Sequence, residues 1–165
     1  MMTIIAATDY SPIAENAVTY AAEMAKYYHC RLLLFNAFKL SLHASNTILP
    51  ASGIAALERS NEYHLQKEAA RIAGAYSIQV DHVTSSTCVE DELKELIKMH
   101  EASLVVLGMA PESLHQELLG NTTTAAIGKM NFPVLAVPIC AQFQGLKKIL
   151  FASDRDDHTQ SQQML

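Results

Sequence analysis

Apolar runs and mixed stretches alternate along this chain. Continuous apolar runs at residues 3–8, 31–37, 103–107 and 133–138 are typical of strands that are buried on both faces. Between residues 78 and 83 apolar and polar side chains alternate instead, which is typical of a strand with one solvated face, as at the edge of a sheet. The pattern therefore predicts five strands, of which the third along the chain is the least buried.

The segments between these runs carry apolar residues at helical spacing. Ser11 and Pro12 form a typical helix start, with serine as the N-cap and proline at the first helical position. The inward face predicted for this helix consists of Ala14, Ala17, Val18, Ala21, Met24, Ala25 and Tyr28. A long loop is expected over residues 38–53 and a second helix over 54–76. The inner face of that helix is predicted to hold Leu65, Ala69, Ile72, Ala73 and Tyr76.

Two more helices are predicted in the second half of the chain. The sequence Thr87-Cys88-Val89-Glu90 has the form of a capping box and indicates a helix start. The inward residues of the helix that follows are predicted to be Val89, Leu93, Leu96 and Ile97. A shorter helix is expected from about Thr122 to Met130, directly before the last strand.

Regular alternation of strands and helices favours an α/β fold with a parallel sheet. We expect a doubly wound, open five-stranded sheet of order 3-2-1-4-5 with helices on both faces, a Rossmann-like architecture. Ligands of such folds bind beyond the carboxyl ends of the strands, where the strand order reverses. That crevice lies between strands one and four, and Asp9 and Gly108 follow these two strands.

Composition and charge narrow the class of protein. The chain has 165 residues, a formal net charge of −5 and no basic run, so nucleic acid is not an expected partner. No apolar stretch approaches the roughly 20 residues of a membrane span, so no membrane association is expected. The three cysteines form no CxxC pair and are interpreted as reduced thiols, which indicates a cytoplasmic location. The histidines show no metal-ligand spacing, so no metal site is expected.

The end of the chain partly repeats its beginning. Residues 148–154, KILFASD, match residues 3–9, TIIAATD, nearly position for position. We therefore predict one α/β domain over residues 1–140, followed over 141–165 by a linker and the truncated start of a second similar domain. The alternative is an ordinary terminal strand and a mobile tail.

The segment between the apolar runs at 103–107 and 133–138 has features of a phosphate-binding loop. Gly120-Asn121-Thr122 stands at the start of the predicted fourth helix, where unpaired N–H groups and the helix dipole favour an anion. Pro111 lacks an N–H donor and fixes its φ angle, which works against a phosphate cradle. No lysine or arginine lies between Gly108 and Gly128, whereas Glu112 adds negative charge, as does Glu117. We therefore expect a pocket whose affinity for phosphate is weakened or lost.

These elements together resemble the universal stress protein family. The resemblance covers residues 3–138 and is strongest in TIIAATDYSPIAENAVTYAAEMA and LLGNTTTAAIGKMNFPVLAVP. It implies an ATP-binding loop in which Gly108 and Gly120 match two of the family's glycines. Pro111 stands in the place of another, with only eight residues before Gly120, one fewer than in the family pattern. Asn121 takes the Ser/Thr position, and Thr122 follows it.

The resemblance also implies where the base and ribose would bind. The adenine and ribose contacts would fall on Ala7, Thr8, Asp9 and Ala37, with Leu107 beside the base. The residues alone leave simpler interpretations open. Asp9 is a residue type that commonly caps a following turn, Gly108 and Gly120 are also usual turn residues, and Asn121-Thr122 can serve as a helix N-cap.

The function expected from this resemblance is that of a cytoplasmic, non-catalytic module that binds or senses an adenine nucleotide, ATP or AMP, with Mg²⁺ or with no cofactor. The first alternative is a nucleotide-free protein that acts by dimerisation, and the second is a slow ATPase. The family's partner surface would be the edge of the fifth strand, in a homodimer or with a tandem domain. Catalysis is disfavoured because the chain has no GxSxG elbow, Walker GK[ST] or carboxylate dyad. A phosphoacceptor domain is disfavoured because the third strand ends in Thr84-Ser85-Ser86 instead of an aspartate.

Overall fold

A computed structural model describes residues 1–38, 51–86, 89–109 and 132–150 of the chain. Its centre is a five-stranded sheet of order β3-β2-β1-β4-β5, in which every strand pair is parallel. The strands are β1 (Thr3–Ala7), β2 (Arg31–Ala37), β3 (Val80–Ser85), β4 (Ala102–Met109) and β5 (Val134–Pro138). The predicted fold class and strand order are confirmed.

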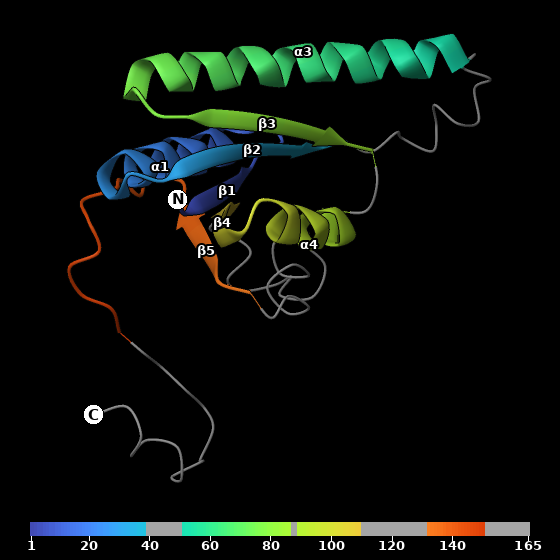
Figure 1. Cartoon of the computed structure of the whole chain (residues 1–165). Helices are drawn as coiled ribbons and strands as arrows, with labels where there is room; N and C mark the ends of the chain where they lie inside the picture. The colour runs from blue at the N-terminus through green and yellow to red at the C-terminus, as the bar shows by residue number, and fades with distance from the viewer. Residues whose placement is uncertain (39–50, 87–88, 110–131, 151–165) are drawn as a thin grey trace, which may run out of the picture.

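Three described helices cover the two faces of this sheet, α1 (Pro12–Tyr28), α3 (Ala51–Tyr76) and α4 (Val89–Met99). Residues of α1 and α3 share one buried cluster with Ile4, Leu32 and Leu34. Leu93 and Leu96 of α4 join a second cluster with Ile5 and Phe35. The odd and even residues of each central strand thus face different helices, as alternation across a strand requires. Figure 1 shows α3 running beside β3, with α4 near β4.

Helix α1 begins as the sequence predicts. Ser11 is the N-cap, with its Oγ accepting a hydrogen bond from the Ala14 N–H at 3.3 Å, and Pro12 follows at the first helical position. The helix ends at His29, which has left-handed backbone angles and whose N–H donates to the Ala25 carbonyl. Six of the seven predicted inward residues are buried, but Tyr28 is 39% exposed. Tyr28 belongs to the last turn, which extends past the buried core.

Several boundaries differ from the prediction, among them the end of β4, which runs to Met109 instead of residue 107, and the starts of α3 and β3. Helix α3 begins at Ala51, so Ala51 to Gly53 are helical instead of belonging to the predicted loop. Strand β3 begins at Val80, two residues after the predicted start, and its half-buried pattern confirms an edge strand. The fully buried residues of α3 are Leu65, Ala69 and Ile72, all in its second half. The amino end of α3 extends beyond the tip of β3 (Figure 1).

The other predictions along the chain lie partly outside the described residues. The structure does not describe most of the loop predicted over residues 38–53 or the capping residues Thr87 and Cys88. It also does not describe the helix expected from about Thr122 to Met130. Of the third predicted helix, α4 is described, and Leu93 and Leu96 are buried in it as predicted while Ile97 is half-buried.

The chain that follows β5 folds back along α1. The Asn16 side-chain amide donates to the carbonyl oxygens of Pro138 at 2.9 Å and Ala141 at 3.2 Å. Further along, the Phe143 ring meets three tyrosines edge-on, with centroid distances of 5.3, 5.7 and 6.1 Å to Tyr20, Tyr27 and Tyr28. Phe143 therefore packs onto the first domain, three residues beyond the boundary expected at residue 140.

The repeated sequence near the end is described only as far as Leu150. Residues 148–150 form no strand, and the side chains of Ile149 and Leu150 are 83% and 94% exposed. The division of the chain into a domain over residues 1–140 and the start of a second unit over 141–165 stays a prediction.

Candidate functional site

The described part of the predicted site lies at the carboxyl ends of the three central strands. Ala7 and Ala37 are the last residues of β1 and β2, and Leu107 lies two residues before the end of β4. All three pack with the cluster around Phe35, on the face of the sheet that α4 covers. The structure thus brings together the three apolar residues that the resemblance assigned to the base and ribose.

Thr8 lies at the same edge, directly after β1, and is itself buried. Its side chain is 8% exposed, its N–H donates to the Phe35 carbonyl at 2.8 Å and its Oγ1 accepts from the Tyr10 N–H at 3.0 Å. These contacts bind the first residue after β1 both to β2 and to the start of α1. Thr8 is therefore held firmly in the site, and its hydroxyl oxygen accepts a hydrogen bond from within the same turn.

Asp9 has the capping role that the sequence left open. Its Oδ1 accepts a hydrogen bond from the Ser11 N–H at 3.0 Å, which closes a turn of the kind that aspartate commonly forms. Asp9 is nevertheless exposed, and a carboxylate has about four acceptor positions. The cap therefore leaves acceptor capacity on Asp9 for a donor at the carboxyl edge of the sheet.

Gly108 lies inside β4 and not in a turn, since the strand continues to Met109. A Cβ atom at this position would be 2.7 Å from Ile13 Cγ2 and 2.8 Å from the Ile13 carbonyl oxygen. The first turn of α1 crosses β4 so closely that only glycine fits. The interpretation of Gly108 as a turn glycine is thus wrong, and packing by itself explains why a glycine stands here.

The sequence reasoning missed Asn36. This residue is the second-last residue of β2, in the run RLLLFNA, and is only 3% exposed. Its side-chain amide donates to the Thr8 carbonyl at 2.6 Å, and its Oδ1 accepts from the Asn61 amide of α3 at 2.5 Å. A polar residue at the end of an otherwise apolar strand was the available signal, because buried amides need hydrogen-bond partners.

Tyr10 closes the turn between β1 and α1 and faces α3. Its backbone φ is 63°, an angle that side chains other than glycine rarely adopt, and its ring meets His64 edge-on at 4.8 Å. Burial, together with the nearby negative charge of Glu68, raises the pKa of the Tyr10 hydroxyl. The hydrogen bond from Arg71 lowers the pKa of Glu68, so this carboxylate is ionised and already paired at neutral pH. Tyr10 therefore stays protonated beside the site.

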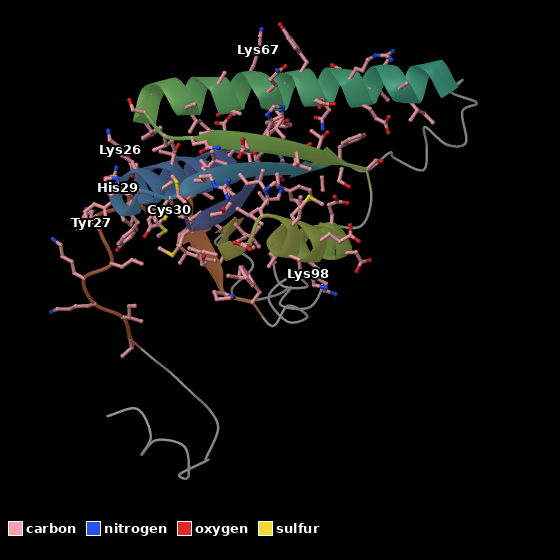
Figure 2. The ribbon with its side chains drawn as sticks, in the orientation of Figure 1. Lys26, Tyr27, His29, Cys30, Lys67 and Lys98 are labelled. Atoms are coloured by element: carbon pink, nitrogen blue, oxygen red, sulfur yellow. The ribbon has the colours of Figure 1, made fainter. Side chains whose placement is uncertain are left out.

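Three lysines lie away from this edge. Lys26 and Lys98 belong to the last turns of α1 and α4, at the opposite ends of these helices from the carboxyl edge. Lys67 points outward from α3 and lies 4.9 Å from the centre of the Tyr63 ring (Figure 2). These side chains offer no counter-charge to an anion at the carboxyl edge.

The predicted phosphate loop lies outside the described residues, including Pro111, Gly120, Asn121 and Thr122. Within the described ranges, no group of three or more His, Cys, Asp or Glu side chains could hold a metal ion. Among the helices of those ranges, none is long and apolar enough to cross a membrane.

The chain is similar in sequence to a known family and in fold to solved structures. A family model described as the universal stress protein family matches residues 1–138. No curated protein sequence matches the chain. A solved universal stress protein in complex with cAMP is 20% identical, with a TM-score of 0.62 over 84% of this chain and 97% of that one.

Two other solved structures also share the fold. A universal stress protein of Archaeoglobus fulgidus in complex with dAMP is 16% identical, with a TM-score of 0.55 over 82% of this chain and 97% of that one. A universal stress protein family member of Arabidopsis thaliana with AMP bound is 13% identical, with a TM-score of 0.57 over 84% and 92%. At these identities the likeness establishes a shared fold.

Proposed function

The chain belongs to the universal stress protein family, and from this we propose that it binds an adenine nucleotide at the carboxyl edge of its sheet without catalysing a reaction. The observation that carries the proposal is the juxtaposition of the exposed Asp9 carboxylate with the small apolar residues Ala7 and Ala37, at the point where the strand order reverses. The cAMP, dAMP and AMP complexes of proteins with the same fold support this choice of ligand.

Each residue has a distinct part in this proposal. Ala7, Ala37 and Leu107 form the apolar surface on which a purine base lies, and the small side chains of the two alanines leave room for it. Asp9 accepts a hydrogen bond from the base or from a ribose hydroxyl through the capacity that the Ser11 cap leaves. The phosphates extend toward Gly120, Asn121 and Thr122, where Mg²⁺ would supply positive charge to a triphosphate.

A sensing role, as opposed to ATP turnover, follows from the charges in this proposal. Phosphoryl transfer depends on cations that neutralise the charge developing on the phosphate oxygens. The sequence from Gly108 to Gly128 has no lysine or arginine, and Glu112 and Glu117 make it acidic. We therefore propose a module that retains a nucleotide, with slow ATP hydrolysis as the outcome that would argue against this role. The cytoplasm is its proposed location, because the three cysteines are interpreted as reduced thiols.

Replacing Asp9 by asparagine is expected to weaken AMP binding at least tenfold, because a hydrogen bond to a charged group contributes about 1.5–3 kcal/mol. Isothermal titration calorimetry with AMP, ATP and cAMP measures this directly, after mass analysis of any nucleotide released from the denatured wild-type protein. Asp81→Asn is the matched control, since Asp81 lies near the start of edge strand β3 opposite Leu33. The absence of co-purified nucleotide together with no binding heat at millimolar nucleotide contradicts the proposal.

Replacing Pro111 by glycine is expected to raise ATP affinity about three- to tenfold, since it restores one backbone donor worth roughly 0.5–1.5 kcal/mol. AMP affinity should change less, because the effect concerns the outer phosphates. Titrations of both nucleotides measure the difference, with Pro133→Gly, before β5, as the control. If ATP affinity stays the same, the shortened loop or the missing positive charge is the actual defect.

One observation favours a second candidate function, that of a nucleotide-free dimeric interaction protein. Strand β5 is at one edge of the sheet, and Val134, Leu135 and Ala136 are only half-buried there. Such an edge is open to pairing with another chain or with a tandem domain. A dimer in solution combined with no nucleotide binding would favour this candidate.

A further inference from the structure

We propose that Asn36 is a positioning residue that orients the Asp9 carboxylate and thereby sets the preference of the site for adenine. The inference rests on the proposed function. It assigns a role to a side chain that is buried next to the site and that does not itself touch the ligand.

Asn36 makes two hydrogen bonds through its side-chain amide. Its Nδ2 donates to the Thr8 carbonyl at 2.6 Å, and its Oδ1 accepts from Asn61 Nδ2 at 2.5 Å. Three elements thus meet at one amide, the turn after β1, the end of β2 and helix α3. With 3% exposure, the amide lies out of water, where hydrogen bonds are stronger and more restrictive of geometry than at the surface.

Asn36 holds the peptide group that joins Thr8 to Asp9. The carbonyl of Thr8 and the N–H of Asp9 belong to the same planar peptide unit, so fixing the oxygen fixes the plane. The orientation of this plane determines the direction in which the Cα–Cβ bond of Asp9 leaves the backbone. Without the Asn36 donor, the plane can tilt and shift the direction of the Asp9 side chain, although the Ser11 N–H still restrains its Oδ1.

The other contacts of the turn restrain different atoms from the one that Asn36 holds. Thr8 is held at its N–H by Phe35, and its Oγ1 receives the Tyr10 N–H, but both contacts lie on other atoms than its carbonyl. Tyr10 next to it has a φ of 63°, an unfavourable angle for a tyrosine. A turn with such strain relaxes when a restraint is removed. The Ser11 N–H holds the Asp9 Oδ1 directly at 3.0 Å, whereas the Asn36 hydrogen bond fixes the peptide plane from which the Asp9 side chain leaves the backbone.

The strand pattern also sets Asn36 apart. Leu32 and Leu34 lie on the same face of β2 and pack in the cluster under α1 and α3, where a third leucine would suit the pattern. An amide in that position costs desolvation that a leucine does not. Its donor is directed at the one peptide group that carries Asp9.

The test compares Asn36→Leu with Asn61→Leu. Asn36→Leu removes the bond to Thr8, whereas Asn61→Leu removes only the support of Asn36 from α3 and is the matched control. AMP and IMP are titrated into each variant well below its unfolding temperature, since IMP lacks the exocyclic amine of adenine. We expect Asn36→Leu to raise the Kd for AMP at least tenfold and to move the ratio of the IMP and AMP Kd values toward one, with changes below threefold for Asn61→Leu.

A role in stability alone would lower the unfolding temperature and leave both Kd values and their ratio unchanged in the folded protein, which overturns the inference. If wild-type protein binds no AMP, the proposed function fails first, and the two failures are thus distinguishable. In case Asn36→Leu does not fold, the wild-type protein provides a second measurement. AMP is expected to shift the NMR signals of the Asn36 side-chain amide, and signals that do not move under AMP saturation overturn the proposal.

Discussion

Replacing Gly108 by alanine is expected to lower the free energy of unfolding by about 1–3 kcal/mol, the usual cost of forcing extra atoms into a packed site. The added Cβ would be 2.7 Å from Ile13 Cγ2 and 2.8 Å from the Ile13 carbonyl oxygen. Because one of these atoms belongs to the backbone, the first turn of α1 has to move away from β4. Urea unfolding followed by circular dichroism measures the loss.

Gly74→Ala is the matched control for this substitution. Gly74 lies in α3, and nothing is within 4 Å of a Cβ added there. Alanine is favoured over glycine in a helix, so this variant is expected to gain about 0.5–1 kcal/mol. Equal stability of Gly108→Ala and the wild-type protein would contradict the close packing of α1 on β4. It would then make ligand contact the remaining reason for a glycine at this position.

Replacing Phe35 by alanine is expected to cost about 3–5 kcal/mol of unfolding free energy, the range measured when large aromatic side chains are removed from protein cores. Phe35 is 1% exposed and lies in the central part of the sheet, beside β1. It packs in the same cluster as Ala7, Ala37 and Leu107. The cavity therefore opens next to the surface proposed for the base, and AMP affinity should fall along with stability.

Two controls separate these effects. Phe35→Leu retains most of the buried volume and is expected to cost about 1.5 kcal/mol or less, with AMP binding largely retained. Leu57→Ala removes a side chain that is 50% exposed on α3 and should change stability by less than about 0.5 kcal/mol. Thermal unfolding with and without AMP measures both quantities. A loss below 1 kcal/mol for Phe35→Ala would contradict the packing of the second cluster.

The sequence predicted correctly those helices and strands whose formation depends on the hydrophobic pattern and capping residues of the segment itself. Strand β2 has the bounds expected from its apolar run, and α1 starts at the Ser11-Pro12 pair. The mixed pattern of β3 indicated an edge strand, which the strand order confirms. In each case the residues that form the sequence pattern are also the ones that form the cap hydrogen bond or become buried in the sheet.

Predictions failed where a residue's environment comes from distant segments. Gly108 was predicted to belong to the nucleotide loop, with a turn glycine as the simpler alternative, but its close contact is with Ile13, which is 95 positions away in sequence. No role was predicted for Asn36, because its partners are Thr8, in the turn after β1, and Asn61, in helix α3. Phe143 belongs to the segment that is predicted to follow the first domain, and its packing against three tyrosines of α1 could not be predicted from that segment alone.

By itself, the sequence determined the fold class, the strand order and the family of this protein, together with the position of Asp9 at the carboxyl edge. Hydrophobic periodicity and capping are local properties, and the rules for parallel sheets leave few topologies once the elements are known. Only the tertiary structure decided that Gly108 serves packing and that Asn36 holds the peptide before Asp9. Both depend on distances of a few ångströms between segments far apart in the chain, and no local pattern encodes such distances.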